Sequence, residues 1–120
     1  MDIETFREYC LSKPFATEHF PFDEQTLVFK LKGKIFALAD IVNFNSVNLK
    51  CEPDLAIELR EQFDAVTPGY HMNKKHWNTI RFDSFISWKQ LKEWIDHSYL
   101  QVLASFPKKD QEEVMAMLRQ

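Results

Sequence analysis

The sequence predicts an α+β fold, a two-layer sandwich in which an antiparallel sheet of about five strands carries helices mainly on one face. Apolar and polar residues alternate over residues 26–51 and 76–82, as they do in strands with one buried face. Segments with helical periodicity flank both runs. Because hairpin-length links join the first strands, the sheet is expected to be antiparallel. The expected order is one helix, three strands, a second helix, two strands and a helical C-terminus.

The chain has the length of one domain, which we place at residues 1–120. Its hydrophobic content of 45% and its 11 phenylalanines predict a packed core and argue against disorder. It contains 2 glycines, which is little material for a loop that cradles phosphates.

The first helix is expected to begin after Asp2, a residue type that caps helix N-termini. Ile3, Phe6 and Cys10 then fall on one face of that helix. Pro14 marks its end, because the residue before a proline is biased away from helical geometry.

A β-hairpin is predicted over residues 26–40, where TLVFKL and KIFALA alternate around the two-residue turn Lys32–Gly33. One face of this hairpin is expected to be buried. Its predicted members are Leu27, Phe29, Leu31, Phe36 and Leu38. The opposite face, which includes Lys30, is expected to be at least partly in contact with water.

Residues 46–51 (SVNLKC) form the third predicted strand, with Lys50 on its polar side. Pro53 suits the first position of the helix that follows. Beyond that helix, a strand is predicted over residues 76–82. Its two sides are Ile80 and Phe82 on one face and Trp77, Thr79 and Arg81 on the other.

The longest helix is predicted over residues 87–106, with Ser87 as its cap and Pro107 at its end. The residues on its core-facing stripe that we expect to be buried are Trp88, Leu91 and Ile95. A short final helix is expected over residues 110–119. The side chains that we expect it to turn inward are Val114, Met117 and Leu118.

Charge and cysteine content favour a reduced, cytoplasmic protein. The net charge is −3 and the pI is near 5.8, so any binding to nucleic acid must depend on a local patch. No apolar run is long enough to span a bilayer, and the N-terminus lacks the pattern of a secretory signal. Cys10 and Cys51 do not make a disulfide framework. We expect no membrane contact and favour a monomer.

The segment over residues 67–81 is the most distinctive stretch, because it follows a Pro–Gly turn with cations, imidazoles and flat rings. Its candidate nucleic-acid-binding residues are Tyr70, His71, Lys74, Lys75, His76, Trp77 and Arg81. Lys30 and Lys50 are expected to join them from the polar face of the sheet. Lysine and arginine bind phosphates, and aromatic rings stack on bases. The alternative interpretation is a solvated sheet face with aromatic residues that complete the packing.

Trp77 and Arg81 lie four residues apart, so a strand presents both on the same face. If this face binds bases, Trp77 is expected to keep one ring face accessible, and Arg81 is expected to lack a buried carboxylate partner. A Trp77 ring covered on both faces would instead indicate a packing role.

Catalytic and metal chemistry find little support in the residues. His71 and His76 match no common zinc spacing, and no CxxC accompanies them. Cys51 is expected to face the core and to be inert, and His97 is expected to form hydrogen bonds in a structural role. The chain also lacks GxGxxG, GxxxxGK[ST], HExxH and GxSxG motifs. We therefore expect no enzyme, no metal and no cofactor.

Blocks of residues along the chain resemble the MmcQ/YjbR family of small bacterial proteins. They are CLSKPFATEHFPF at 10–22, TLVFKLKGKIFAL at 26–38, VNLKCEPDLAIELRE at 47–61, PGYHMNKKHWNTI at 68–80 and LKEWIDHSY at 91–99. The resemblance implies a frataxin-related, CyaY-like fold, similar to secretion chaperones, with two β-hairpin wings and a DNA-binding role. One departure is Phe15, which stands where the family usually has glycine, so a tight turn is less expected there.

Two classes of function stay open. The first is a non-enzymatic DNA-binding module whose contacts are weak, salt-dependent and largely independent of sequence. The second is a chaperone-like module that binds a protein or peptide and no nucleic acid. Strong salt dependence of binding to a duplex would favour the first.

Overall fold

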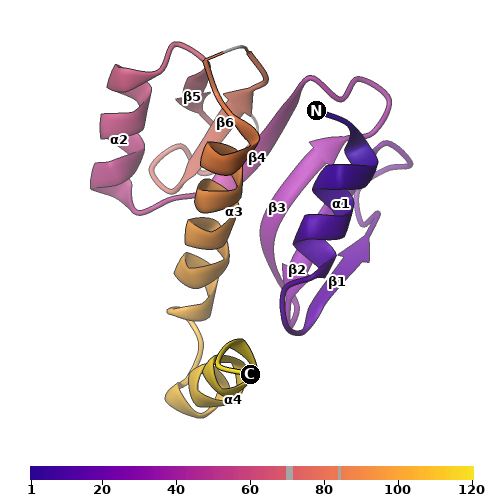
Figure 1. Cartoon of the computed structure of the whole chain (residues 1–120), viewed down its shortest axis with the longest axis vertical. Coiled ribbons are helices and arrows are strands. Elements are labelled where there is room, and N and C mark those ends of the chain that lie inside the picture. The colour runs from indigo at the N-terminus through magenta and orange to yellow at the C-terminus, as the bar shows by residue number, and fades with distance from the viewer. Residues whose placement is uncertain (70–71, 84) are drawn as a thin grey trace.

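The computed structural model describes residues 1–69, 72–83 and 85–120 of the chain (Figure 1). The elements are α1 (Ile3–Leu11), β1 (Ala16–His19), β2 (Thr26–Leu31), β3 (Lys34–Asp40), β4 (Ser46–Lys50), α2 (Pro53–Gln62), β5 (Val66–Pro68), β6 (Trp77–Arg81), α3 (Trp88–Leu103) and α4 (Lys108–Leu118). The predicted α+β class is confirmed. The sheet has six strands, because the short strand β1 follows α1 directly. Four residues are too few to show a period, which is why alternation did not predict this strand.

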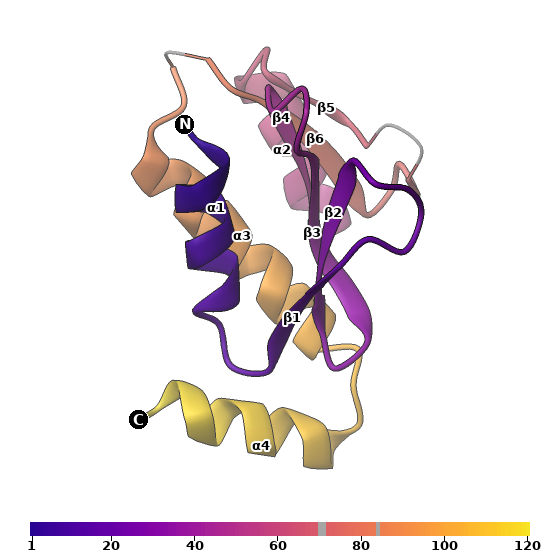
Figure 2. The same cartoon turned by 90° about the vertical axis from the view of Figure 1, so that its right-hand side faces the viewer.

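The sheet is antiparallel throughout, with the strand order β1-β2-β3-β4-β6-β5. Figure 2 shows α1 and α3 in front of one face, with α4 crossing beneath them. Buried residues of all four helices join one cluster with that face, among them Phe6 of α1, Ala56 of α2, Leu91 of α3 and Val114 of α4. None of the helices in the described part of the chain covers the opposite face, which we call the uncovered face.

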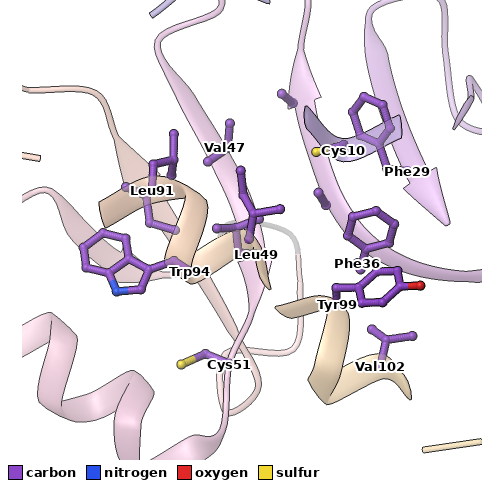
Figure 3. Close-up of a cluster of buried hydrophobic side chains, with 14 of the residues drawn as sticks. Cys10, Phe29, Phe36, Val47, Leu49, Cys51, Leu91, Trp94, Tyr99 and Val102 are labelled. Carbon is purple, nitrogen blue, oxygen red and sulfur yellow. The ribbon is translucent and has the colours of Figure 1, made fainter. Parts of the chain in front are cut away.

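The middle of the core is aromatic (Figure 3). Phe36 of β3 meets the edge of Tyr99 of α3 with ring centroids 5.3 Å apart, and Phe6 of α1 meets Phe29 of β2 at 5.6 Å. All four rings are essentially inaccessible to water. Edge-to-face contacts of this kind stabilise a core beyond the area that they bury.

A β-bulge in β3 changes the predicted face of Leu38. Phe29 pairs with Ala37 and Lys30 pairs with Ile35, so Phe36 is an extra residue on its strand. Phe36 and Ala37 therefore both belong to the core cluster, while Leu38 joins Val28 in a second cluster on the uncovered face. The prediction that Leu38 shares the core face is wrong, because strict alternation cannot show an inserted residue.

Fewer residue pairs join β3 and β4 than join any other neighbouring strands of the sheet. These strands pair at two positions, Ala37 with Leu49 and Leu38 with Asn48. Beyond them, Ser98 of α3 bridges the two strands, because its hydroxyl accepts from the Lys50 N–H at 2.8 Å and donates to the Phe36 carbonyl at 2.5 Å. We call this junction the seam.

α3 begins as predicted at the Ser87 cap, whose hydroxyl accepts from the Gln90 N–H at 3.0 Å. Its predicted core residues Leu91 and Ile95 are buried, but Trp88 is only partly buried. Trp88 lies at the rim of the core, where its ring packs against the edge of Tyr9 at 5.5 Å. Among the helices of the described ranges, none is both long and apolar enough to cross a membrane.

α4 docks through its N-terminal half. Val114 is fully buried, and the ammonium of Lys32 lies 3.3 Å from Asp110 and 3.2 Å from Glu113. Further along, Met117 and Leu118 are exposed, so the prediction that they point inward is wrong. The side chains that follow Val114 are exposed, and helical periodicity does not show where the contact of a helix with the core ends.

Two turns use left-handed backbone. Lys32 and Gly33 have φ angles of 46° and 89°, as the predicted two-residue hairpin turn requires. Phe15 has a φ of 62°, although it carries a side chain. The tight turn between α1 and β1 therefore forms without the glycine that is usual in the family. It does so at a residue for which this conformation is unfavourable.

Candidate nucleic-acid interface

The loop between β5 and β6 is closed at its base by Gly69 and Trp77. The Gly69 N–H donates to the Trp77 carbonyl at 2.7 Å. A Cβ at position 69 would lie 2.7 Å from the Cβ of Trp77 and 3.0 Å from its carbonyl oxygen. Glycine is needed here for close approach of two strands, and its φ lies outside the left-handed region that the Pro–Gly turn suggested.

Asn73 shapes the part of the loop that carries the lysines. Its side-chain oxygen accepts from the Lys75 N–H at 2.9 Å, and its carbonyl accepts from the Trp77 N–H at 3.0 Å. The resulting turn leaves Lys74 and Lys75 exposed and His76 half-buried. Of the predicted site residues, Tyr70 and His71 lie outside the described residues.

Arg60 of α2 holds this turn from the helix side. Its Nε donates to the side-chain oxygen of Asn78 at 2.7 Å. Its Nη2 donates to the Trp77 carbonyl at 3.3 Å and to the Lys74 carbonyl. The role of Arg60 could not be predicted, since nothing in the helical pattern sets this arginine apart from other surface cations.

The strand register gathers lysines near Trp77 on the uncovered face. Lys50 of β4 pairs directly with Trp77 of β6, and Lys30 of β2 pairs with Ile35 of β3. Ile35 packs against the same cluster as Trp77. Lys30 and Lys50 therefore lie on either side of one small apolar cluster, close to the turn with Lys74.

Trp77 is buried and cannot serve as a stacking platform. Its residue surface is 8% exposed, and it packs with Val28, Leu38, Ile35 and Met72. The prediction that one ring face stays accessible is wrong. The physical reason is the bulge in β3, which turns Leu38 onto the uncovered face and gives the indole apolar neighbours. The case for stacking of bases on Trp77 is therefore lost, and with it most of the case for single-stranded nucleic acid.

Arg81 lies away from these lysines. It pairs with Ser46 at the far end of β4, four residues along β6 from Trp77, which is roughly 13 Å in an extended strand. Its side chain is 56% exposed, and its guanidinium lies 3.9 Å from Asp83, which is itself 26% exposed. The carboxylate beside Arg81 is thus partly buried and forms a loose pair with the exposed guanidinium. The structure thus separates Arg81 from the other cations.

The end of the uncovered face near Arg81 is acidic and hollowed. A groove of about 680 Å³ lies there, lined by Phe22, Asp23, Thr26, Leu38, Asp40, Ser46, Asn48, Met72 and Thr79. Asp40 accepts from the Val42 N–H at 2.8 Å, and hydrogen bonds from the N–H groups of Gln25 and Thr26 lower the pKa of Asp23. Both carboxylates are therefore engaged in turns, and the lowered pKa favours the charged form of Asp23. This groove could not be predicted from the sequence, because its lining comes from five separate segments.

Asp96 and Tyr99 of the DHSY block tie α3 to the N-terminal helix. Asp96 accepts a hydrogen bond from the Tyr9 hydroxyl at 2.5 Å and forms a salt bridge with Lys13. The Tyr99 hydroxyl donates to the Pro14 carbonyl at 2.6 Å. These contacts give the block a structural role.

His97 of the same block supports the start of α2. Its Nε2 accepts a hydrogen bond from the Glu52 N–H at 3.1 Å, so the ring must be neutral at that nitrogen. Burial lowers the pKa of His97, and the charge of Glu52 opposes that shift. The hydrogen-bonding role expected for His97 is therefore confirmed.

Cysteine and metal chemistry gain no support from the geometry. Cys10 and Cys51 are both buried, and burial raises the pKa of the Cys51 thiol to about 11. Thiols with raised pKa values are poor nucleophiles at neutral pH. Within the described ranges, no three histidine, cysteine or acidic side chains gather in a way that could hold a metal ion.

Comparison with known proteins points to one family. The family model described as YjbR matches residues 11–101. Two curated relatives from Escherichia coli carry the names uncharacterized protein YbdF (strain O157:H7) and uncharacterized protein YjbR (strain K12). YbdF is 35% identical over 112 residues, which is 92% of either chain. YjbR is 33% identical over 109 residues, which is 90% of this chain and 92% of the relative.

Solved structures agree with the sequence comparison. The crystal structure of a Deinococcus radiodurans protein with a DUF419 domain has a TM-score of 0.86 and 36% identity. The aligned region covers 94% of this chain and 87% of the Deinococcus radiodurans chain. A crystal structure of a protein from Pseudomonas syringae has a TM-score of 0.67 and 26% identity, covering 82% of this chain and 96% of its own.

Proposed function

The chain belongs to the YjbR family, and on that premise we propose that it is a small non-enzymatic module that binds duplex DNA through the phosphate backbone. The residues that we assign to phosphate contacts are Lys30, Lys50, Lys74, Lys75 and His76. Trp77 is left out because it is buried, and Arg81 because it lies at the acidic end of the face.

The observation that carries this proposal is a group of four lysines at one end of the uncovered face. They are Lys30, Lys50, Lys74 and Lys75. Within the described part of the chain, none of them forms a salt bridge with an aspartate or glutamate, whereas Lys13 and Lys32 do. Their charges are therefore available to phosphates, which bind lysine as a point charge.

The same geometry sets limits on the interaction. A net charge of −3 gives little long-range attraction, so binding is modest and depends strongly on salt. Because Trp77 is buried, single strands gain no stacking energy from its ring. A duplex, whose phosphates are closely and regularly spaced, is therefore the better ligand. Base sequence has little influence on the affinity.

Charge reversal in the loop tests the proposal. Labelled duplex DNA is titrated at two salt concentrations with the wild type and with Lys74→Glu combined with Lys75→Glu. Loss of two phosphate contacts is expected to reduce the slope of log K against log salt by about 1.8. The matched control is Lys108→Glu with Lys109→Glu, which makes the same change in net charge on exposed residues of α4. Figure 1 shows α4 at the opposite end of the molecule from β5 and β6.

The control is expected to bind nearly as well as the wild type, and both double variants are expected to keep their circular dichroism spectra. Undiminished binding by the loop variant would remove the loop from the proposal. A wild type that does not bind duplex DNA at low salt would contradict the proposal as a whole.

We also propose a second candidate function, recognition of a protein or peptide. It is supported by the groove of about 680 Å³ at the acidic end, beside which Phe22 is 65% exposed. Grooves of this size accommodate side chains or small ligands, and exposed aromatic residues are frequent anchors. A stable complex with a protein whose affinity does not change with salt would favour this function over the first.

A further inference from the structure

Arg60 connects the helix layer to the loop that presents the lysines. It lies in the last turn of α2 and donates to three acceptors: the Asn78 side chain at 2.7 Å, the Trp77 carbonyl at 3.3 Å and the Lys74 carbonyl. Two of these acceptors lie in or at the end of the turn that carries Lys74 and Lys75.

Asn78 makes this connection rigid. It is 2% exposed, on the face of β6 that the helices cover. Its side-chain nitrogen lies 3.5 Å from the carbonyl of Ala56, which also belongs to α2. One buried amide thus joins α2 both directly and through Arg60.

We infer that Arg60 is a positioning residue for nucleic-acid binding, which rests on the function proposed above. It fixes the turn over residues 73–76 so that Lys74 and Lys75 face the same side as Lys50, and its own charge does not contact the phosphates.

The donor geometry of arginine explains why it performs this role. Its Nε and Nη2 are already used by acceptors of the protein, and the residue is half-buried. A planar guanidinium can donate to several acceptors in a fixed fork, whereas lysine offers a single flexible ammonium group. Without this fork, the turn over residues 73–76 would keep the hydrogen bonds of Asn73 but lose its link to α2, so more of the ordering of the lysines would fall to the binding step.

Arg60→Lys separates position from charge, because it keeps the cation and loses the fork. The loss of preorganisation is expected to weaken duplex binding by about three- to tenfold. Asn78→Ser, which removes the Nε acceptor without changing any charge, is expected to act in the same direction. Hydrogen exchange of the amides in residues 72–77 is expected to be faster in both variants than in the wild type.

A double-mutant cycle shows whether Arg60 acts through the two lysines. In a protein that carries Lys74→Gln and Lys75→Gln, adding Arg60→Lys is expected to weaken duplex binding no further. If Arg60→Lys costs the same factor in both backgrounds, it acts independently of these lysines and the inference is wrong. Full duplex binding by Arg60→Lys would also contradict it.

Hydrogen exchange gives a readout that does not need DNA. Unchanged exchange over residues 72–77 in folded Arg60→Lys would show that this arginine does not hold the turn. If instead the variant exchanges faster but the wild type does not bind duplex DNA, Arg60 holds the turn and the proposed function fails. The two failures are therefore distinguishable.

Discussion

The DHSY block (residues 96–99) shows how single side chains join the elements of this protein, and His97 is its member whose pKa is lowered by burial. Its neutral Nε2 accepts from the Glu52 N–H, which begins α2. Protonation replaces that acceptor with a donor, so the hydrogen bond cannot form in the charged state.

The lowered pKa of His97 predicts that the folded protein loses stability in mild acid. Because burial lowers its pKa in the folded state, the folded protein binds this proton less readily than the unfolded chain. The stabilisation that neutral His97 provides is complete above the pKa of histidine in the unfolded chain, about 6.5. It is lost as the pH falls from there through the pKa of His97 in the folded protein. Urea unfolding at a series of pH values from about 8 to 5 measures the effect.

The variant His97→Gln removes the titration and is expected to show a flatter pH profile over this range. The control His19→Gln changes an exposed histidine of β1 and is expected to retain the wild-type profile. Identical pH profiles for the wild type and His97→Gln would show that His97 does not cause the loss.

Residue patterns predicted the buried faces of most strands but not the environment of Trp77. Alternation correctly placed Ile80 in the core and Lys50 on the opposite face, because burial follows the two-residue period of a strand. The prediction of an exposed ring at Trp77 was wrong because the surroundings of this residue depend on Leu38. A bulge in β3 places Leu38 on the uncovered face instead of the core face. A local pattern contains no information on such a three-strand contact.

At the scale of elements, the turn between α1 and β1 requires an unfavourable backbone conformation at one residue. Phe15 adopts a φ of 62° there, which a residue with a Cβ does at a cost of about 1–2 kcal/mol. Its ring is 41% exposed and lies under the ammonium of Lys32, 4.8 Å from the ring centroid. The attraction between the Lys32 ammonium and the Phe15 ring offsets part of this conformational free energy.

Paired substitutions at this turn isolate the backbone cost. Phe15→Gly and Phe15→Ala lose the same ring, so their difference reports the left-handed backbone. We expect Phe15→Gly to be more stable than Phe15→Ala by about 1 kcal/mol in urea unfolding, the reverse of the usual order. At Phe20, an exposed residue without a positive φ, alanine is expected to be at least as stable as glycine. An alanine variant as stable as the glycine variant at position 15 would argue against strain in this turn.

Element boundaries could be predicted where local chemistry marks them. The Ser87 cap and the Lys32–Gly33 turn are found where the sequence places them, because capping and turn formation depend on a few adjacent residues. β1 and the docking of α4 could not be predicted, since both depend on contacts with distant segments.

At the scale of the whole molecule, one buried cluster contains residues from every helix and from five of the strands, so local and global unfolding should coincide. Cys10 lies in this cluster from α1, and Cys51 lies in it just before α2. The two thiols report on distant parts of the same core.

Thiol labelling tests this cooperativity. Both cysteines are expected to be unreactive toward a thiol reagent in native buffer, because burial shields them and raises their pKa values. In rising urea, both are expected to react together, at the concentration where circular dichroism reports unfolding. Separate single variants, Cys10→Ala and Cys51→Ala, assign each signal. Reaction of Cys51 well before the global transition would instead show that α2 opens independently.

The seam between β3 and β4 divides the sheet into two three-stranded halves, β1-β2-β3 and β4-β6-β5, that are joined by two residue pairs and one serine. Lys30 belongs to the first half, and Lys50, Lys74 and Lys75 belong to the second or to its loop. The distance between the two groups of cations is therefore a function of the dihedral angle between the halves. In the DNA-binding function proposed above, that angle, rather than the identity of any single side chain, would set the spacing of the phosphates that Lys30 and the second group of lysines reach together.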